Sequence, residues 1–293
     1  MSLKIFSVEL LKMRKRWLPY LLFLVMLGGV SVIIWLGGYG SWKTDAELEY
    51  QGAALRTFVL PWSLVALVDS GQFWGSFLIG VLVASGVATE YSWGTVRQAL
   101  IRGQTRSQYL TMKLVGLALM STVLLLAALG VGVLFSILAT AIAGEPITFD
   151  APGGPSFIET VLIILRAGYG ILPYALLAFA LTVVSRSTAM GVAGTLVFII
   201  GEAILGEVLR NLGGPAPDIR AALIGPNVSA LLAANTFSPV EYNSMAFREL
   251  PVASELPPAS TATVVIAAYC AFFLAAAYAV FQRRDLGVES GGG

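Results

Sequence analysis

The sequence contains no histidine and a single cysteine, Cys270. Without histidine, the chain cannot form a Ser-His catalytic triad or a histidine-based metal site, and one thiol cannot form a disulfide within the chain. It also has no G-x-x-x-x-G-K-[ST] phosphate-binding loop, so we do not expect it to hydrolyse ATP by itself. We therefore predict no catalytic residue, no metal site and no bound cofactor on this chain, and we expect no nucleic-acid partner.

Charge is also scarce, because only 12% of the residues are charged and 57% are hydrophobic. A soluble domain would need more polar residues to cover its surface. A helix needs about 20 apolar residues to cross a hydrocarbon core of about 30 Å. Six windows qualify, over residues 17–37, 71–89, 114–142, 157–184, 189–206 and 261–281. Because these windows are long and continuous, they predict helices rather than barrel strands. The expected fold is an all-α integral membrane protein whose residues 1–293 form one transmembrane domain.

The positions of lysine and arginine predict the orientation, since positively charged flanks stay in the cytoplasm. With six spans, the N-terminus, the 90–113 loop, the 185–188 turn and the C-terminus share one side. That side holds twelve of the 18 cations and only four of the 17 acids. We therefore expect both termini to be cytoplasmic. Residues 207–260 then form a long extracellular segment, which carries seven of the 13 prolines and cannot be one helix.

Two further segments are predicted to lie along the membrane interface. In residues 2–16, apolar side chains recur at three- and four-residue steps while Glu9 and Lys12 occupy a polar side, a pattern typical of an interfacial amphipathic helix. The alternative for this segment is a charge cluster that only sets topology. The apolar run 58–68 is too short to cross, and it predicts an interfacial helix before the second span.

Few charges fall inside the apolar windows. They are Glu159 and Arg166 in the fourth window and Glu202 in the fifth. Ionisable residues are costly in lipid, so a pairing of Arg166 with Glu202 is expected. Such a group is either an outer gate or substrate contact, or a structural ion pair near the interface.

Small residues form a stripe on the second span, where they recur every four positions. The members are Ser76, Gly80, Ala84 and Ala88. Such a stripe allows another helix to approach closely. The approaching helix belongs either to the same chain or to a second copy.

The segment between the second and third spans combines positive charge with helix signals. Its cations are Arg97, Arg102, Arg106 and Lys113, against the single acid Glu90. Gly94 interrupts the chain, residues 95–101 can form a short helix, and Gly103 provides a turn. Thr105 followed by Gln108 predicts a capping box that starts the next helix. A short basic helix held between two spans is suited to docking on an acidic soluble partner, whereas a loop that only sets topology needs the cations alone.

At these residues the chain resembles the membrane (permease) subunits of type-two ATP-binding-cassette exporters, of the bacitracin-export, sodium-export and lantibiotic-immunity kind. The resemblance is carried by "EYSWGTVRQALIRGQTRSQYLTMKL", which has the family's order of acid, aromatic, Gly-Thr, Arg and a basic start to the third span. It extends to the amphipathic N-terminus, the six spans and the ending "FQRRDL". The chain departs from the family in its long proline-rich outer segment.

The resemblance implies a subunit that exports or extracts a substrate by alternating access. It implies an elbow helix at 2–16 and a coupling helix around 95–102 that docks on a separate ATPase, which binds the ATP and magnesium. Two permeases, identical or homologous, would join two ATPases in a bacterial inner membrane. The implied ATPase contacts are Glu90, Gly94, Thr95, Arg97, Arg102, Gly103 and Arg106. Two other functions stay open from the residues alone, an ion-coupled secondary carrier and a membrane assembly or sensor protein without transport.

Overall fold

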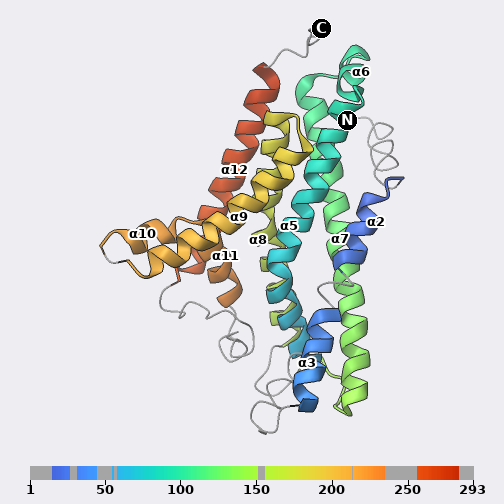
Figure 1. Cartoon of the computed structure of the whole chain (residues 1–293), viewed down its shortest axis with the longest axis vertical. Coiled ribbons are helices and arrows are strands. Elements are labelled where there is room, and N and C mark those ends of the chain that lie inside the picture. Colours follow the sequence, from blue (N-terminus) through green and yellow to red (C-terminus); the bar gives the residue numbers. More distant parts are fainter. Residues whose placement is uncertain are drawn as a thin grey trace.

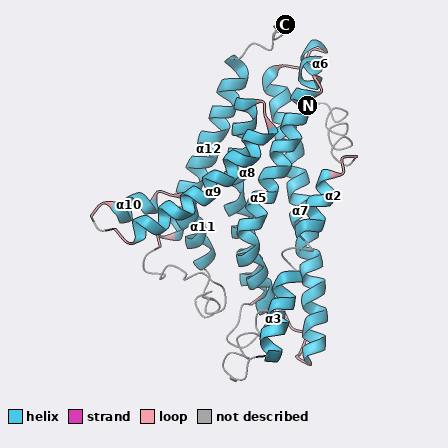
Figure 2. Ribbon diagram, viewed as in Figure 1, coloured by secondary structure: helices cyan, strands magenta, loops and turns pink. Residues whose placement is uncertain are grey.

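The computed structural model describes residues 15–26, 32–44, 55, 58–150, 156–212, 214–234 and 256–283. Within these ranges the regular structure is entirely helical, with no strand, which confirms the all-α prediction (Figure 2). The helices are α2 (Leu18–Val25), α3 (Val32–Thr44), α5 (Trp62–Ser92), α6 (Thr95–Ile101), α7 (Arg106–Ala143), α8 (Phe157–Ser185), α9 (Thr188–Arg210), α10 (Ala216–Ala221), α11 (Ile224–Ala233) and α12 (Ala259–Arg283), as labelled in Figure 1.

Five of the described helices are long and apolar enough to cross a membrane. They are α5 over Gly71–Ser92, α7, α8, α9 and α12, and they match five of the six predicted windows. The chain is thus a helical protein with the composition of a multi-pass membrane protein. The first window, 17–37, contains α2 and the start of α3, with residues 27–31 outside the described ranges. The predicted interfacial helix over 2–16 also lies outside them, apart from its last two residues.

Helix α5 differs from the sequence-based expectation at its start. We predicted a separate interfacial helix over 58–68, but Trp62 to Ser92 form one continuous helix of 31 residues. Pro61 stands immediately before the first helical residue, and no proline follows until the helix has ended. Proline is tolerated at that position because the first N–H groups of a helix have no intrahelical partner. At 1.5 Å per residue, α5 is roughly 46 Å long.

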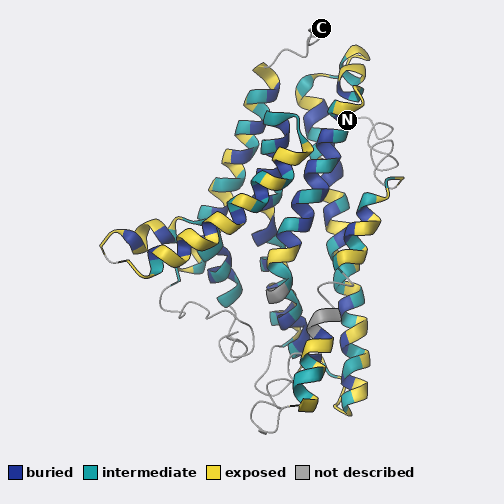
Figure 3. Cartoon of the chain, in the orientation of Figure 1, coloured by how far each residue is buried: buried dark blue, intermediate teal, exposed yellow. Residues whose placement is uncertain are grey.

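The core of the bundle forms where α5 and α8 meet, and Figure 3 shows buried residues concentrated on these two helices. By contrast, α7, α9 and α12 expose much of their apolar surface. Among the fully enclosed side chains are Ile79 of α5 and Phe179 of α8. The central pair is therefore packed like a protein interior, and the outer helices present the surface that suits lipid.

The small-residue stripe of α5 is buried inside this chain. A Cβ added at Gly80 would lie 3.3 Å from Thr195 Cγ2 of α9 and 3.6 Å from Ala178 Cβ of α8. A Cβ added at Gly191 of α9 would lie 2.8 Å from Ala84 Cβ. Close approach of α9 and α8 thus explains the stripe. Of the two partners left open by the sequence, the structure shows the same chain.

Helices α10 and α11 project from one side of the bundle (Figure 1). Helix α11 returns to pack against α12, α8 and α9. Part of the proline-rich segment 207–260 is therefore folded into short helices that extend the core, as the apolar run in its sequence allows.

Candidate functional site

The basic hairpin between α5 and α7 has the order that its sequence predicts. Helix α6 occupies Thr95–Ile101, and left-handed glycines flank it, Gly94 with φ 64° and Gly103 with φ 87°. Glycine adopts this conformation without steric cost, so the chain can turn sharply at both ends. Thr105 and Gln108 form the predicted capping box, with each backbone N–H 3.2 Å from the other residue's side-chain oxygen.

The four cations of the hairpin do not share one environment. Arg97 on α6 and Arg102, which directly follows it, are exposed, whereas Val96 of α6 is buried. Arg106 is half-buried, and its Nη1 donates to the Gln282 carbonyl of α12 over 2.6 Å. Lys113 is 3% exposed, so it does not belong to the exposed surface of the hairpin. Its position on α7 turns it toward the carboxylate at the end of α5.

Glu90 is the centre of a buried polar network. Its Oε1 lies 3.1 Å from Lys113 Nζ and 3.6 Å from Arg16 Nη2. Its Oε2 accepts hydrogen bonds from Thr95 Oγ1 over 2.6 Å and from Tyr109 OH over 3.3 Å. A buried carboxylate is stable only when it is paired and hydrogen-bonded, and these four groups supply both conditions.

This network changes the roles of two residues that were predicted to contact the ATPase, Glu90 and Thr95. Glu90 is 1% exposed, so it cannot touch a docked protein directly, and half-buried Thr95 uses its hydroxyl on Glu90. The burial follows from the position of Glu90, two residues before α5 ends and facing α7. Glu90 instead joins α5, α6, α7 and the segment before α2. We call this group, Glu90 with Arg16, Thr95, Tyr109 and Lys113, the hairpin root.

Other contacts gather the positively charged segments at the hairpin end of the bundle. The Arg16 guanidinium lies 5.2 Å from the ring centroid of Trp93. Arg186, in the turn between α8 and α9, lies 6.0 Å from the ring of Tyr91. Together with the Arg106 bond to Gln282, these contacts bring together the four segments predicted to share one side of the membrane, and Figure 1 shows α6 and the end of α12 at the same end.

The three intramembrane charges are separated. Glu159 closes a capping box at the start of α8, where its Oε2 accepts from Ser156 N over 2.9 Å. Arg166 is half-buried and lines a shallow hollow with Tyr169 and Leu231. Within the described part of the chain, Glu202 makes no ion pair with Arg166, so the expected pairing is not formed there.

Glu202 instead holds a helix end. It is 7% exposed and accepts from Tyr174 OH over 3.0 Å and from Ile224 N. Ile224 is the first residue of α11, whose N-cap residue, Leu223, supplies no capping side chain. A carboxylate from α9 thus caps α11, where it also complements the helix dipole. Sequence patterns miss this arrangement because the capping residue is not local.

Nearby Asn227 was also missed by the sequence analysis. It is fully buried, and its amide nitrogen donates to the carbonyls of Ala221 over 2.7 Å and Leu223 over 2.6 Å. These bonds fix the turn between α10 and α11. In the sequence Asn227 is a polar residue within an apolar run, which does not by itself indicate burial.

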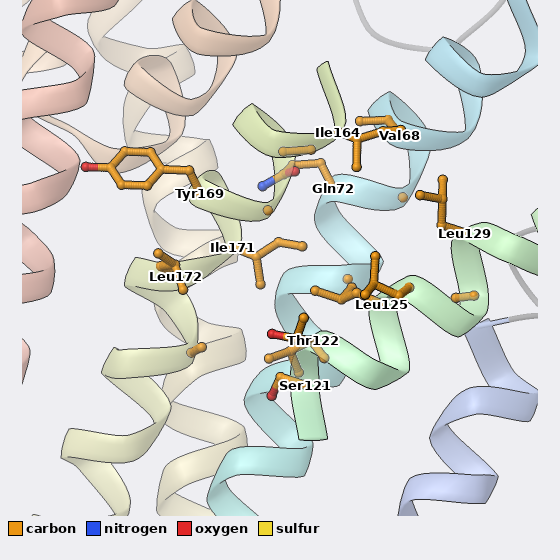
Figure 4. Close-up of a pocket in the computed structure, with 18 of the residues that line it drawn as sticks. Val68, Gln72, Ser121, Thr122, Leu125, Leu129, Ile164, Tyr169, Ile171 and Leu172 are labelled. Carbon is orange, nitrogen blue, oxygen red and sulfur yellow. The ribbon is translucent and has the colours of Figure 1, made fainter. Parts of the chain in front are cut away.

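A further feature is an apolar cavity of about 550 Å³ between α5, α7 and α8 (Figure 4). Polar side chains on its wall include Gln72 of α5 and Ser121 of α7. The sequence analysis did not select either residue. Gln72 stood at the edge of a predicted span, where a polar residue carries no special signal.

A comparison with curated proteins finds no match. A family model described as "Protein of unknown function (DUF2705)" matches residues 61–287. The matched range begins immediately before α5 and contains all five of the described helices that are long enough to span a membrane. The chain therefore belongs to the DUF2705 family.

Proposed function

We propose that this chain is the permease subunit of an ATP-binding-cassette exporter, which moves or extracts a substrate by alternating access while a separate ATPase hydrolyses ATP. In this proposal residues 17–37 complete a six-span domain, and the hairpin end with both termini faces the cytoplasm. The observation that carries the proposal is the hairpin itself. A short basic helix stands at one end of the bundle on a buried, charge-paired root.

The hairpin combines the two properties that mechanical coupling needs. Its root is rigid, because Glu90 ties α6 to α5 and α7 through Thr95 and Lys113. Its outer face is free to bind, because Arg97, Ile101 and Arg102 are exposed. A partner that displaced α6 would therefore move the ends of two long helices.

In this proposal, exposure decides which of the expected residues contact the ATPase. Gly94, Arg97, Arg102 and Gly103 are exposed and keep the contact role that we expected from the resemblance. Glu90 and Thr95 become positioning residues of the root. Arg106 connects α7 to the last turn of α12, so in this proposal it passes motion of the hairpin to a third helix.

A binding experiment tests the docking role. The full-length chain is purified with the ATP-binding-cassette ATPase encoded beside it, and the affinity of the two proteins is measured for wild type and for the double variant Arg97→Glu/Arg102→Glu. One exposed ion pair is worth only about 0–1 kcal/mol, so both cations are reversed together. Reversal also adds repulsion, and we expect affinity to fall roughly tenfold or more, with slower association.

The matched control is Lys43→Glu/Arg210→Glu, which makes the same charge change outside the hairpin, on α3 and at the end of α9. We expect this control to bind as wild type does. Wild-type affinity in the Arg97→Glu/Arg102→Glu variant would exclude α6 as the docking helix. Failure of the wild-type chain to bind any such ATPase would favour a gradient-driven carrier or an assembly protein.

A labelling experiment tests the orientation. In a Cys270→Ala background, Lys43→Cys and Thr105→Cys each place one thiol at an exposed position, on α3 and beside α6 respectively. A membrane-impermeant thiol reagent added to intact cells should label Lys43→Cys and leave Thr105→Cys unlabelled. Labelling of Thr105→Cys would place the hairpin outside and remove the ATPase from the proposal.

A further inference from the structure

The cavity between α5, α7 and α8 contains polar atoms that have no hydrogen-bond partner among the residues that the structure describes. Both amide atoms of Gln72, Nε2 and Oε1, are buried and make no hydrogen bond to any described residue, and the same holds for Ser121 Oγ. Figure 4 shows Gln72 extending from α5 toward α8 on the cavity wall. Buried polar groups in native proteins are nearly always hydrogen-bonded, so an amide with both atoms unpaired indicates a missing ligand.

The other residues that line the cavity indicate the chemical character of that ligand. The cavity volume of about 550 Å³ lies within the roughly 300–1,000 Å³ of small-molecule sites. Leucines, isoleucines and alanines dominate the lining, among them Leu117, Leu125 and Ile171. A ligand that fills this space must therefore be mostly apolar, with its few polar atoms close to Gln72.

The cavity opens at the side of the bundle. Trp74, Leu126 and Leu165 line it and are also among the exposed large side chains of the chain. They come from α5, α7 and α8 respectively, so the mouth lies where these three helices face outward. In a membrane-spanning bundle this mouth meets lipid, not water, and the molecules that can enter it are those dissolved in the bilayer.

The depth of Gln72 agrees with a lipid ligand. Gln72 and Glu90 lie on the same helix, 18 residues and therefore roughly 27 Å apart along its axis. This separation is close to the thickness of the hydrocarbon core, about 30 Å. With the hairpin root at one membrane surface, Gln72 lies at the opposite boundary, where the polar groups of lipids begin.

We propose that this cavity binds a single-chain lipid that carries an ester carbonyl beside a free hydroxyl, as a monoacylated glycerolipid does. The carbonyl accepts from Gln72 Nε2, the hydroxyl donates to Gln72 Oε1, and the acyl chain extends past Ile171 along the leucine side chains of the wall. One acyl chain suits an undivided apolar cavity, and the paired donor and acceptor match the two unpaired amide atoms. This binding site needs no ATPase, so it goes beyond the transport function proposed above.

Photolabelling of the purified full-length chain, without any ATPase, tests the site. The protein is reconstituted in phosphatidylcholine vesicles that contain lysophosphatidylcholine with a diazirine in its acyl chain, and the labelled peptides are mapped by mass spectrometry. A second probe replaces the ester by an ether and so lacks the carbonyl. In wild type we expect the ester probe to label cavity residues roughly two- to tenfold more than the ether probe, the range that one net hydrogen bond gives.

Variants identify the side chains that matter. Gln72→Leu should label equally with both probes, because it has no amide to recognise the carbonyl. Ala118→Phe adds a ring at a residue that lines the cavity and should remove most labelling, whereas Ala127→Phe adds the same ring to α7 at a residue that does not line it; both positions are exposed. Ala127→Phe should therefore label as wild type does.

Wild-type protein also provides a test that needs no substitution. An excess of unlabelled lysophosphatidylcholine should suppress labelling of the cavity, although diacyl phosphatidylcholine, the bulk lipid of the vesicles, does not. Equal labelling by both probes in wild type, or full labelling of Ala118→Phe, would overturn the proposal. The absence of any lipid adduct in the cavity would also overturn it. Cross-linked dimers would then reveal that a second copy of the chain covers the mouth.

Discussion

Glu90 and Glu202 are both buried carboxylates in long apolar helices, yet their surroundings differ. Glu90 has two cations within 3.6 Å and accepts from two hydroxyl groups. Glu202 accepts from one hydroxyl and from the backbone at the start of α11. Ion pairs connect Glu90 to segments that meet at one end of the bundle. Neutral hydrogen-bond donors connect Glu202 to the start of α11.

The difference shows what each carboxylate does for its surroundings. A buried ion pair is costly to desolvate, and it is destabilising when one partner is lost. Loss of Glu90 from the hairpin root should therefore lower the stability of the protein strongly. Loss of Glu202 should lower the free energy of unfolding by less, because the hydrogen-bond donors around it carry no charge.

The largest expected effect is at the hairpin root. Glu90→Leu leaves Lys113 and Arg16 without their carboxylate, and we expect the free energy of unfolding to fall by about 3–5 kcal/mol. Thermal unfolding of the protein in detergent measures the change. Adding Lys113→Met should recover part of the loss, because it removes one of the two cations that were paired with Glu90. An unchanged melting temperature for Glu90→Leu would show that the root does not hold the hairpin.

Glu202→Leu tests the other carboxylate. It removes the acceptor of Tyr174 OH and of the Ile224 N–H, at about 1–2 kcal/mol for each, and we expect a total loss of about 2–4 kcal/mol. The same unfolding assay applies. The double variant Tyr174→Phe/Glu202→Leu should lose less than the sum of the single losses, since both single variants remove the same Tyr174–Glu202 hydrogen bond. Additive losses would contradict the contact between the two side chains.

A third comparison is between the two halves of α9. The first half packs closely on α5 and α8, and the second half carries Glu202, which caps α11. Gly191→Ala places a methyl group against Thr182 Oγ1 and 2.8 Å from Ala84 Cβ, and we expect it to destabilise the protein by about 1–3 kcal/mol. Gly201→Ala on the same helix meets nothing within 4 Å and should instead stabilise by up to about 1 kcal/mol. Equal melting temperatures for the two variants would argue against close packing of α9 on α5 and α8.

The smallest effects come from removing single hydroxyl groups. Tyr109→Phe and Tyr174→Phe each delete one donor to a carboxylate, at about 0.5–1.5 kcal/mol for a typical hydrogen bond. Tyr109→Phe should cost less, because Glu90 keeps Lys113, Arg16 and Thr95. Tyr174→Phe should cost more, because Glu202 then keeps only backbone donors. The reverse order in the unfolding assay would mean that the cations of the root do not compensate.

Local patterns were sufficient for most of the helices. Continuous apolar windows located α7, α8, α9 and α12, and the glycine and capping signals located α6 and the start of α7. They failed where two patterns adjoin, as at the start of α5. The run 58–68 was judged by its own length, although nothing in the sequence breaks the helix between Trp62 and Gly71.

The site was less predictable, because its pairings are tertiary. Lys113 and Glu90 stand 23 residues apart, and no periodicity within one helix indicates that they meet. Sequence reasoning therefore counted Lys113 with the exposed cations. Glu202 was recognised as costly, but a cap on a helix from another part of the chain could not be seen. Gln72 became informative only when the cavity beside it was known.

The length of α7 has a consequence for the bilayer. Its exposed apolar side chains extend from Val115 to Ile142, which at 1.5 Å per residue is a band of roughly 40 Å. The hydrocarbon core is only about 30 Å thick, so hydrophobic mismatch must be relieved by tilt of the helix or by local thickening of the lipid. Membrane thickness therefore acts on the angle of α7, and through it on the orientation of the hairpin at its N-terminal end.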